Sequence, residues 1–370
     1  MRNWASATGI FLVVQFGLSA VAPVMATEPA PVANSVETLI QQAREARAQG
    51  RSASAMAQFV EAASLSPRDP APLIEAGRAA LAVDDNDLAL GYFQRAKDLD
   101  QNSIDARVGH ASALSALAKH DLALAAWRVL AATLSDRPDI KMGLARAEYD
   151  SGNVKLAKKL FAEALKADPS SIDNRLLFAR FQIDSGSPKP AIQTLSNLLK
   201  SSPTSLDALM QRANAYDWAK QWSRGDTDAE AALGAAPKSA DIRYARGVRA
   251  LSIDDYDPAI IEFSKALELD PAHVFARIKR AQANNSLNKQ DATLRDLHAA
   301  NVARPNLALI LRMRGQAYLA LDDYLLARDF LDAAIALDPN DDDAKQARTT
   351  VLQRLGETSV GETASVPKLK

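Results

Sequence analysis

The chain contains no cysteine among its 370 residues. It therefore has no disulfide bond, no thiol nucleophile and no zinc–thiolate site, and no lipid can be attached to an N-terminal cysteine. The lack of cysteine assigns no cellular compartment by itself, although it is compatible with an oxidising one.

An excess of charge of one sign is missing as well. Forty-four Lys and Arg residues balance 45 Asp and Glu residues, which leaves a net charge of −1 and an isoelectric point near 6.5. Without a basic field around the molecule, a dedicated nucleic-acid binder is disfavoured. Aromatic residues make up only 6% of the chain although 48% of it is hydrophobic, so the apolar content consists mainly of aliphatic side chains.

The motifs of catalysis and of metal binding are also absent. No glycine-rich phosphate loop, nucleophile elbow or HExxH sequence occurs, and the four histidines have no metal-ligand spacing. Acidic runs such as Asp338–Asp343 lack the central glycine and distal glutamate of an EF-hand loop. We therefore expect no enzymatic activity, no metal site and no cofactor.

What the chain does have is a period of 34 residues. Nine units follow one another without an insertion, at 36–69, 70–103, 104–137, 138–171, 172–205, 206–239, 240–273, 274–307 and 308–341. Position 8 of the unit is always small, as Ala43, Gly77, Ala111, Ala145, Ala179, Ala213, Gly247, Ala281 and Gly315. Positions 20 and 27 are alanine in seven units each, and position 32 is proline in seven.

These positions have physical reasons. Small residues in both halves of the unit allow two helices to approach closely. A large residue at position 24 is predicted to fill the space between neighbouring units; it is Phe59, Phe93, Trp127, Phe161 or Phe263 in five of them. The proline cannot continue a helix, so the chain must turn there into the next unit.

The pattern resembles the tetratricopeptide repeat family, whose unit is a 34-residue helix–turn–helix. The resemblance extends over about five-sixths of the chain. It implies an all-α fold, a right-handed superhelical solenoid of nine repeats without a single core. The second helix is expected at positions 18–31. Residues 342–356 are predicted to form a C-terminal capping helix, and 357–370 a disordered tail.

The N-terminal 26 residues have the features of a secretory signal peptide. Arg2 precedes the apolar run Ile10–Ala22, and small residues at Val24 and Ala26 suit a signal peptidase. We expect cleavage after Ala26, export to a bacterial periplasm, and a flexible linker over 27–35. The alternative is an uncleaved signal that anchors the protein in the inner membrane.

The resemblance also implies a concave groove, lined by the first helices of the units, in which a peptide or protein partner binds. The expected groove residues are Arg44, Arg78, Met142, Arg146, Tyr149, Leu176, Arg180, Met210, Asn214, Trp218 and Tyr244. Arginine forks beside apolar side chains suit a peptide that carries acidic and hydrophobic groups. The alternative is that the arginines form a solvated face, paired with Asp150 and Asp184. The Lys and Asn set of the family's carboxylate clamp is missing from its positions.

The sixth unit departs most from the pattern. Gly225 and Ala229 replace the usual alanine and aromatic residue, so its second helix is predicted to pack loosely. Trp218 is either an exposed anchor for a partner or local packing. Trp222 is predicted to lie in the core, because Tyr256 and Tyr324 occupy its position in later units.

A series of aspartates, one at the start of each first helix, recurs in five units. It comprises Asp105, Asp139, Asp173, Asp207 and Asp241. We interpret these residues as helix caps that interact with the helix dipole, in preference to an acidic binding stripe.

These observations predict a non-catalytic protein–protein interaction scaffold or adaptor of the cell envelope. Similarity to envelope members of the family suggests an export or assembly apparatus for polysaccharide, pili or outer-membrane proteins. The alternative is a holdase-like or regulatory binder of unfolded or secreted chains. A polysaccharide-binding scaffold would need more aromatic platforms than Trp218, Tyr149 and Tyr244 supply.

Overall fold

The structure is a computed structural model that describes residues 35–356. This part of the chain forms nineteen α-helices and no β-strand. The predicted signal peptide, the linker up to residue 34 and the tail at 357–370 lie outside the described residues.

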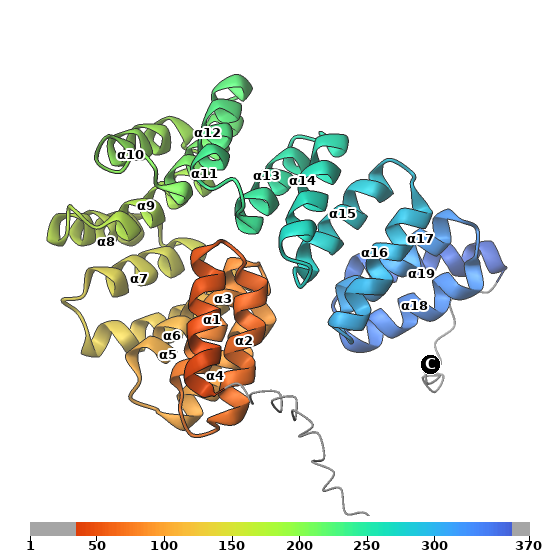
Figure 1. Cartoon of the computed structure of the whole chain (residues 1–370), viewed down its shortest axis with the longest axis horizontal. Coiled ribbons are helices and arrows are strands. Elements are labelled where there is room, and N and C mark those ends of the chain that lie inside the picture. Colours follow the sequence, from red (N-terminus) through yellow and green to blue (C-terminus); the bar gives the residue numbers. More distant parts are fainter. Residues whose placement is uncertain (1–34, 357–370) are drawn as a thin grey trace, which may run out of the picture. The chain divides into compact units, whose positions relative to one another are not determined.

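Each predicted 34-residue unit contains one helical hairpin, and the hairpins follow one another in sequence order (Figure 1). The first helices are α1 (Val36–Ala48), α3 (Ala71–Ala82), α5 (Ile104–Ala116), α7 (Pro138–Asp150), α9 (Ile172–Asp184), α11 (Leu206–Trp218), α13 (Ala240–Ser252), α15 (Val274–Ser286) and α17 (Ala308–Ala320). The second helices are α2 (Ser52–Leu65), α4 (Asn86–Leu99), α6 (His120–Thr133), α8 (Val154–Ala167), α10 (Pro188–Ser201), α12 (Trp222–Ala235), α14 (Tyr256–Leu269), α16 (Gln290–Ala303) and α18 (Tyr324–Leu337). The second helices thus begin one position earlier than predicted. A final helix, α19 (Asp342–Leu355), follows the ninth hairpin, as predicted.

One residue in the left-handed conformation makes the turn inside every hairpin. It is always position 15, at Gly50, Asp84, Ala118, Gly152, Gly186, Lys220, Asp254, Asn288 and Asp322, with φ between 53° and 87°. Glycine, aspartate and asparagine tolerate this region, and they occupy seven of the nine positions. Ala118 and Lys220 adopt it at a steric cost.

Serines, and not the predicted aspartates, cap the first helices. The hydroxyls of Ser103, Ser171, Ser205 and Ser239 each accept a hydrogen bond from the third residue of the following helix. The aspartates lie two residues later, inside the first turn, where a carboxylate still favours the positive end of the helix dipole. The capping interpretation was therefore wrong in its hydrogen bonds, although the aspartates do occupy the acidic first turn.

Large aromatic side chains link neighbouring units, as predicted. Phe93 is fully buried, and a Cβ atom placed on Gly77 of its own unit or Gly109 of the next would lie 2.7 or 2.1 Å from its ring. Trp127 packs in the same way on Gly143 of the following unit, where a Cβ would lie 2.3 Å away. Small and large residues thus interlock from one hairpin to the next.

The interior is a row of small apolar clusters, one after another along the chain, and not a single core. Helix α19 closes the last of them with the buried side chains Ala344 and Val351. Its exposed face carries Lys345 and Gln346, and Gly356, with φ 72°, ends it. The lone terminal helix thus covers apolar surface and presents a polar face outward.

Candidate partner-binding surface

Three of the eleven predicted groove residues are core residues. Met142, Leu176 and Tyr244 are only 1%, 8% and 5% exposed. Position 5 of the unit faces the interior of the hairpin stack, so the apolar side chains there are explained by packing. These three side chains do not line a partner-binding surface, and that prediction was wrong for them.

The arginines at position 9 divide into two kinds. Arg78 forms ion pairs with Glu75 (2.6 Å) and Asp105 (3.3 Å), and Arg146 pairs with Asp150 (2.9 Å) and with Asp184. Burial lowers the pKa of Arg146, but its hydrogen bonds to Asp184 and Asp150 outweigh that effect, so the net pKa is raised. The alternative interpretation, a face of paired charges, thus describes Arg78 and Arg146.

Arg44 and Arg180 are the other kind. Both side chains are exposed, and within residues 35–356 neither has an ion-pair or hydrogen-bond partner. Among the four arginines of the predicted groove, these two remain free to bind an anionic group of a partner.

An exposed stripe runs along α11 in the sixth unit. Its exposed side chains are Asn214 and Trp218, four residues apart on one face of the helix; Met210, four residues earlier on that face, is partly buried and packs against the apolar cluster that contains Leu209. Trp218 is 64% exposed, the second most exposed of the large hydrophobic side chains among the described residues. Helix α9, which carries Arg180, packs next to α11. We call Met210, Asn214, Trp218 and Arg180 the α11 surface.

Tyr149 is partly buried and does not belong to this surface. Its ring packs edge-on against Phe181, with 4.9 Å between the ring centroids. It therefore packs in the apolar cluster between the fourth and fifth units.

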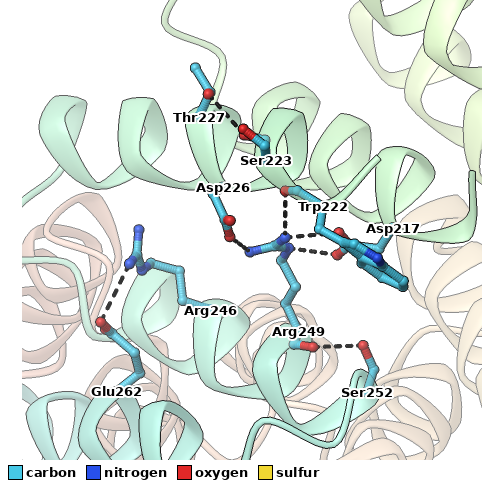
Figure 2. A network of polar contacts seen from close by, with 9 residues as sticks. All are labelled: Asp217, Trp222, Ser223, Asp226, Thr227, Arg246, Arg249, Ser252 and Glu262. Carbon is cyan, nitrogen blue, oxygen red and sulfur yellow. Dashed lines mark hydrogen bonds and ion pairs between the residues drawn. The ribbon is translucent and has the colours of Figure 1, made fainter. Parts of the chain in front are cut away.

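An ion-pair network replaces aromatic packing beside the sixth unit (Figure 2). Arg249 of α13 is 9% exposed, and its guanidinium donates to both oxygens of Asp217 at 2.5 and 2.8 Å and to Asp226 at 2.7 Å. Burial lowers the pKa of Arg249, but hydrogen bonds to the two carboxylates outweigh that effect and keep it charged. The network ties α11, α12 and α13 together.

Gly225 is part of this arrangement. A Cβ atom at this position would lie 2.7 Å from Arg249 Nη2, 2.7 Å from Asp217 Oδ1 and 3.1 Å from the Ala213 carbonyl oxygen. The loss of the usual alanine therefore does not leave a loosely packed helix at this point, because the guanidinium occupies the space. The prediction of loose packing was wrong there for this reason.

Trp222 lies at the surface, with 44% of its side chain exposed, so its predicted place in the core was wrong. Position 17 is the first residue of the second helix, at the outer end of the hairpin. Tyr256 and Tyr324 at the same position are also only partly buried, and their hydroxyls donate to Asp254 and Asp322. Trp222 thus resembles Tyr256 and Tyr324, as predicted from their shared position in the repeat. The error lay in taking position 17 for a core position.

A second set of ionic links, which we did not predict from the sequence, recurs in two units. Arg212 donates to Asp228 of its own unit and to Ser196 of the unit before. Arg280 does the same with Asp296 and Ser264. Each of these residues recurs 68 positions later, which is two periods, so the spacing contained the signal that would have revealed them.

A cleft of about 500 Å³ lies between α4, α5 and α6. Its floor includes Ala126 and Leu130, and Lys97, Arg107 and His110 stand at its sides. Partial burial lowers the pKa of His110, and the charge of Lys97 adds to that effect. The cleft carries no cluster suited to a metal, and residues 35–356 contain no group of three or more carboxylate or imidazole side chains that would hold one.

None of the helices in the described part of the chain is both long and apolar enough to cross a membrane. The predictions about the N-terminal segment lie outside this part.

The stacked hairpins define an α-helical repeat solenoid. Models of the tetratricopeptide repeat match residues 40–104, 108–172, 148–215, 240–273 and 311–341. The chain belongs to the tetratricopeptide repeat family.

Similar proteins include Hsc70-interacting protein 1 and Hsc70-interacting protein 2 of Drosophila melanogaster. Each is 33% identical over 121 residues, which is 30% of this chain and 32% of the relative. The match thus spans about a third of the length of these relatives.

Among solved structures, the APC/C hetero-tetramer Cut9–Hcn1 has a TM-score of 0.47 at 15% identity and covers 80% of this chain and 58% of its own. A tetratricopeptide repeat protein from Parabacteroides merdae ATCC 43184 has a TM-score of 0.41 at 19% identity, over 63% of this chain and 93% of its own. Membership of the tetratricopeptide repeat family supports a role as a protein–protein interaction scaffold.

Proposed function

We propose that this protein is a non-catalytic adaptor of the cell envelope that is exported and binds one protein partner through the α11 surface. The observation that carries the proposal is Trp218. A tryptophan that is 64% exposed on the first helix of a repeat, with a free arginine on the first helix that packs next to it, has the features of an interface anchor.

The side chains of the α11 surface indicate the chemistry of the partner. Trp218 and Met210 offer apolar contact, Asn214 offers an amide, and Arg180 offers a guanidinium without a carboxylate partner among the described residues. An extended or helical segment with one bulky apolar residue and a nearby acidic residue satisfies all four. Arg44, on the first unit, adds a second free cation for a longer segment.

The test is affinity capture from an envelope extract with protein that begins at residue 27. The variant Trp218→Ala/Arg180→Glu is compared with Arg295→Glu, an exposed arginine on α16 that lies away from this surface. Circular dichroism first establishes that all three proteins are equally helical, and mass spectrometry then identifies what each retains.

The proposal predicts that one partner or complex is retained by the unchanged protein and by Arg295→Glu and is lost from the double variant. If all three proteins retain the same broad mixture, the α11 surface is not the site, and the holdase-like alternative gains support. Retention of a defined partner by all three would move the site elsewhere on the solenoid.

Export is a separate part of the proposal. It rests on the signal-like residues 1–26. The full-length chain is expressed in a bacterium and fractionated, and the intact mass is measured. We expect periplasmic protein that lacks residues 1–26; full-length protein in the membrane fraction would instead support the uncleaved anchor.

A further inference from the structure

Helical hairpins that are far apart in the sequence touch each other. The turns inside the first two hairpins contact the junctions on either side of the seventh hairpin and the junction after the eighth. Hydrogen bonds join residues that are between 160 and 219 positions apart. We call this contact the seam. Its residues are Gly50, Ser52, Ser54, Asp84 and Asp85 on one side, and Ser239, Asp241, Tyr244, Asp270, His273 and Arg304 on the other.

The turn of the first hairpin forms half of the seam. The Gly50 carbonyl accepts a hydrogen bond from the Asp241 backbone N–H at 2.9 Å. Ser52 donates its N–H and its hydroxyl to the Asp241 carboxylate at 3.2 and 2.5 Å. Ser54 donates the same two groups to Asp270 at 3.1 and 2.7 Å. The start of α2 thus supplies two N–H groups and two hydroxyls to two carboxylates.

The turn of the second hairpin forms the other half. The Tyr244 hydroxyl donates to Asp84 at 2.8 Å. The Arg304 guanidinium donates to both oxygens of Asp85, at 3.0 and 2.7 Å, and Asp85 is only 3% exposed. Hydrogen bonding to Asp85 raises the pKa of Arg304 and holds it charged, with burial opposing. This bidentate pair has the geometry of a strong charge-assisted contact.

Two seam residues, Ser54 and Arg304, differ from their counterparts in other repeats. Ser54 stands where Leu88, Leu122, Leu156 and Leu326 lie in other units. Arg304 stands where Asp100, Asp168, Asp270 and Asp338 lie. Gly50 has φ 67°, and a Cβ there would come within 2.0 Å of Ser239 Oγ. Ser54 and Arg304, which both depart from the repeat pattern, therefore lie where distant hairpins meet.

His273 is the seam's buried titratable group. It is fully buried, and its Nδ1 accepts the N–H of Ala276 at 3.2 Å as the cap of α15. Its ring lies 4.4 Å from the ring of Tyr244, and its Nε2 has no partner among residues 35–356. The carboxylates of Asp270 and Asp84 face it, and Asp241 lies next to Asp270. If Nδ1 were protonated, it would become a donor that faces the N–H donor of Ala276, and the capping hydrogen bond could not form.

The hydrogen bonds that cross the seam join hydroxyls, carboxylates, a guanidinium and backbone groups, all of which water can solvate if the contact separates. We propose that the seam is a reversible latch, which joins hairpins 1 and 2 to hairpins 7 and 8 and opens without unfolding any hairpin. An interface of interlocked aromatic rings would not separate in this way, because it would expose apolar surface.

Two titratable groups make closure of the latch depend on pH, and their effects on closure are opposite. Burial lowers the pKa of His273 to about 4, against its ordinary 6.5, although Asp270 and Asp84 pull the other way. The contribution of His273 to the stability of the closed latch is therefore fully present above pH 6.5 and is lost as the pH falls towards 4. Burial raises the pKa of Asp241 despite its hydrogen bonds from Ser52, which favours closure in acid. The His273 shift, taken alone, favours opening on the order of a hundredfold at pH 4.5.

The absence of cysteine makes a direct test possible, because spin labels can be attached to two introduced cysteines alone. Ala48→Cys with Ala235→Cys places labels on exposed sites on either side of the seam. Ala235→Cys with Glu268→Cys places both labels on the same side of the seam, on α12 and α14 of adjacent units, so their distance does not depend on closure. Pulsed electron resonance then reports both distance distributions. No partner is needed, so the outcome is independent of the proposed function.

At pH 7.5 we expect a single short distance across the seam. The variant Ser54→Leu/Arg304→Asp, which restores residues found at these positions in other units, shifts it to a long, broad distribution, while the control pair and the helicity are unchanged. A long distance in the unchanged chain, or a short one in the variant, overturns the latch.

Lowering the pH to 4.5 gives a second readout. We expect the open population across the seam to rise in the unchanged chain, and not in His273→Asn, whose side-chain oxygen still caps α15. An equal response in both proteins, or none in either, would show that His273 does not control the latch.

Discussion

Two kinds of contact hold hairpins together in this protein, and they differ in chemistry. Neighbouring hairpins interlock through buried rings such as Phe93, which sits on Gly77 and Gly109. Hairpins that are distant in the sequence meet at the seam through Ser52, Ser54 and their carboxylate acceptors. Burying a phenylalanine side chain stabilises by about 1.5–3 kcal/mol, whereas an intramolecular hydrogen bond contributes a net of about 0.5–1.5 kcal/mol.

The difference follows from what water offers when each contact separates. Water cannot replace the packing of a ring, but it can hydrogen-bond to every group that donates or accepts a hydrogen bond across the seam. Stacking between neighbours is therefore the permanent part of the fold, and the seam is its adjustable part. Four experiments test this contrast.

The largest effect is expected at a stacking contact. Phe93→Ala leaves a cavity between the second and third hairpins and should lower the free energy of unfolding by about 3–5 kcal/mol. Denaturant unfolding followed by circular dichroism measures the loss. A loss below about 1 kcal/mol would mean that the two hairpins collapse onto each other and that the ring is not needed.

Next comes Gly225→Ala, which restores the residue that seven units carry at this position. The new methyl group meets Arg249 and Asp217, so we expect a loss of about 1–3 kcal/mol. Gly234→Ala on the same helix is the matched control, because nothing lies within 4 Å of its Cβ position. The control should gain about 0.5–1 kcal/mol in helix propensity. A gain in both variants would show that the ion pair moves aside freely.

A smaller effect, of opposite sign, is expected in the turns. Ala118 has φ 53° at the position where three other units use glycine. Ala118→Gly removes the steric cost and should raise the free energy of unfolding by about 1 kcal/mol. The greater backbone entropy of glycine in the unfolded chain offsets part of this gain. Gly152→Ala, with φ 87° and open space around it, is the mirror experiment and should destabilise. Thermal unfolding of both variants checks the pair.

The smallest effect on global unfolding is expected at the seam. Removing one partner of a buried pair that cannot separate costs about 3–5 kcal/mol. In Arg304→Asp, however, the seam opens and water solvates Asp85, so the loss should remain below about 1 kcal/mol. Denaturant unfolding at pH 7.5 measures it. A loss of about 3–5 kcal/mol would show that the seam is as permanent as the packing between neighbouring hairpins, which contradicts the contrast between the two contacts.

Much of the fold was predictable because it is local. The period, the proline after seven of the nine second helices and the small residues at position 8 all act within one unit or between neighbours. The lone helix α19, ended by Gly356, followed from the same pattern. The position in the repeat gave wrong predictions where we used it to infer which way a side chain points. Met142, Leu176 and Tyr244 point into the core, and Trp222 lies at the surface.

The candidate surface was predictable in part. Trp218 stood out because no other unit has a tryptophan at its position, and the structure leaves it exposed. The arginines at position 9 recurred with the period, but only the structure distinguished Arg78 and Arg146, which are paired, from Arg44 and Arg180. Pairing depends on which carboxylate the next hairpin brings near, and that is a matter of side-chain geometry.

By itself, then, the sequence determined the hairpins and the way each packs on the next, because those contacts lie within one or two periods and repeat nine times. Tertiary structure alone decided that Arg249 would fill the site at Gly225, and that Ser54 and Arg304 would meet partners 216 and 219 residues away. The physical reason is accumulation. Each hairpin turns slightly relative to the one before, and only the sum over several hairpins brings distant turns into contact.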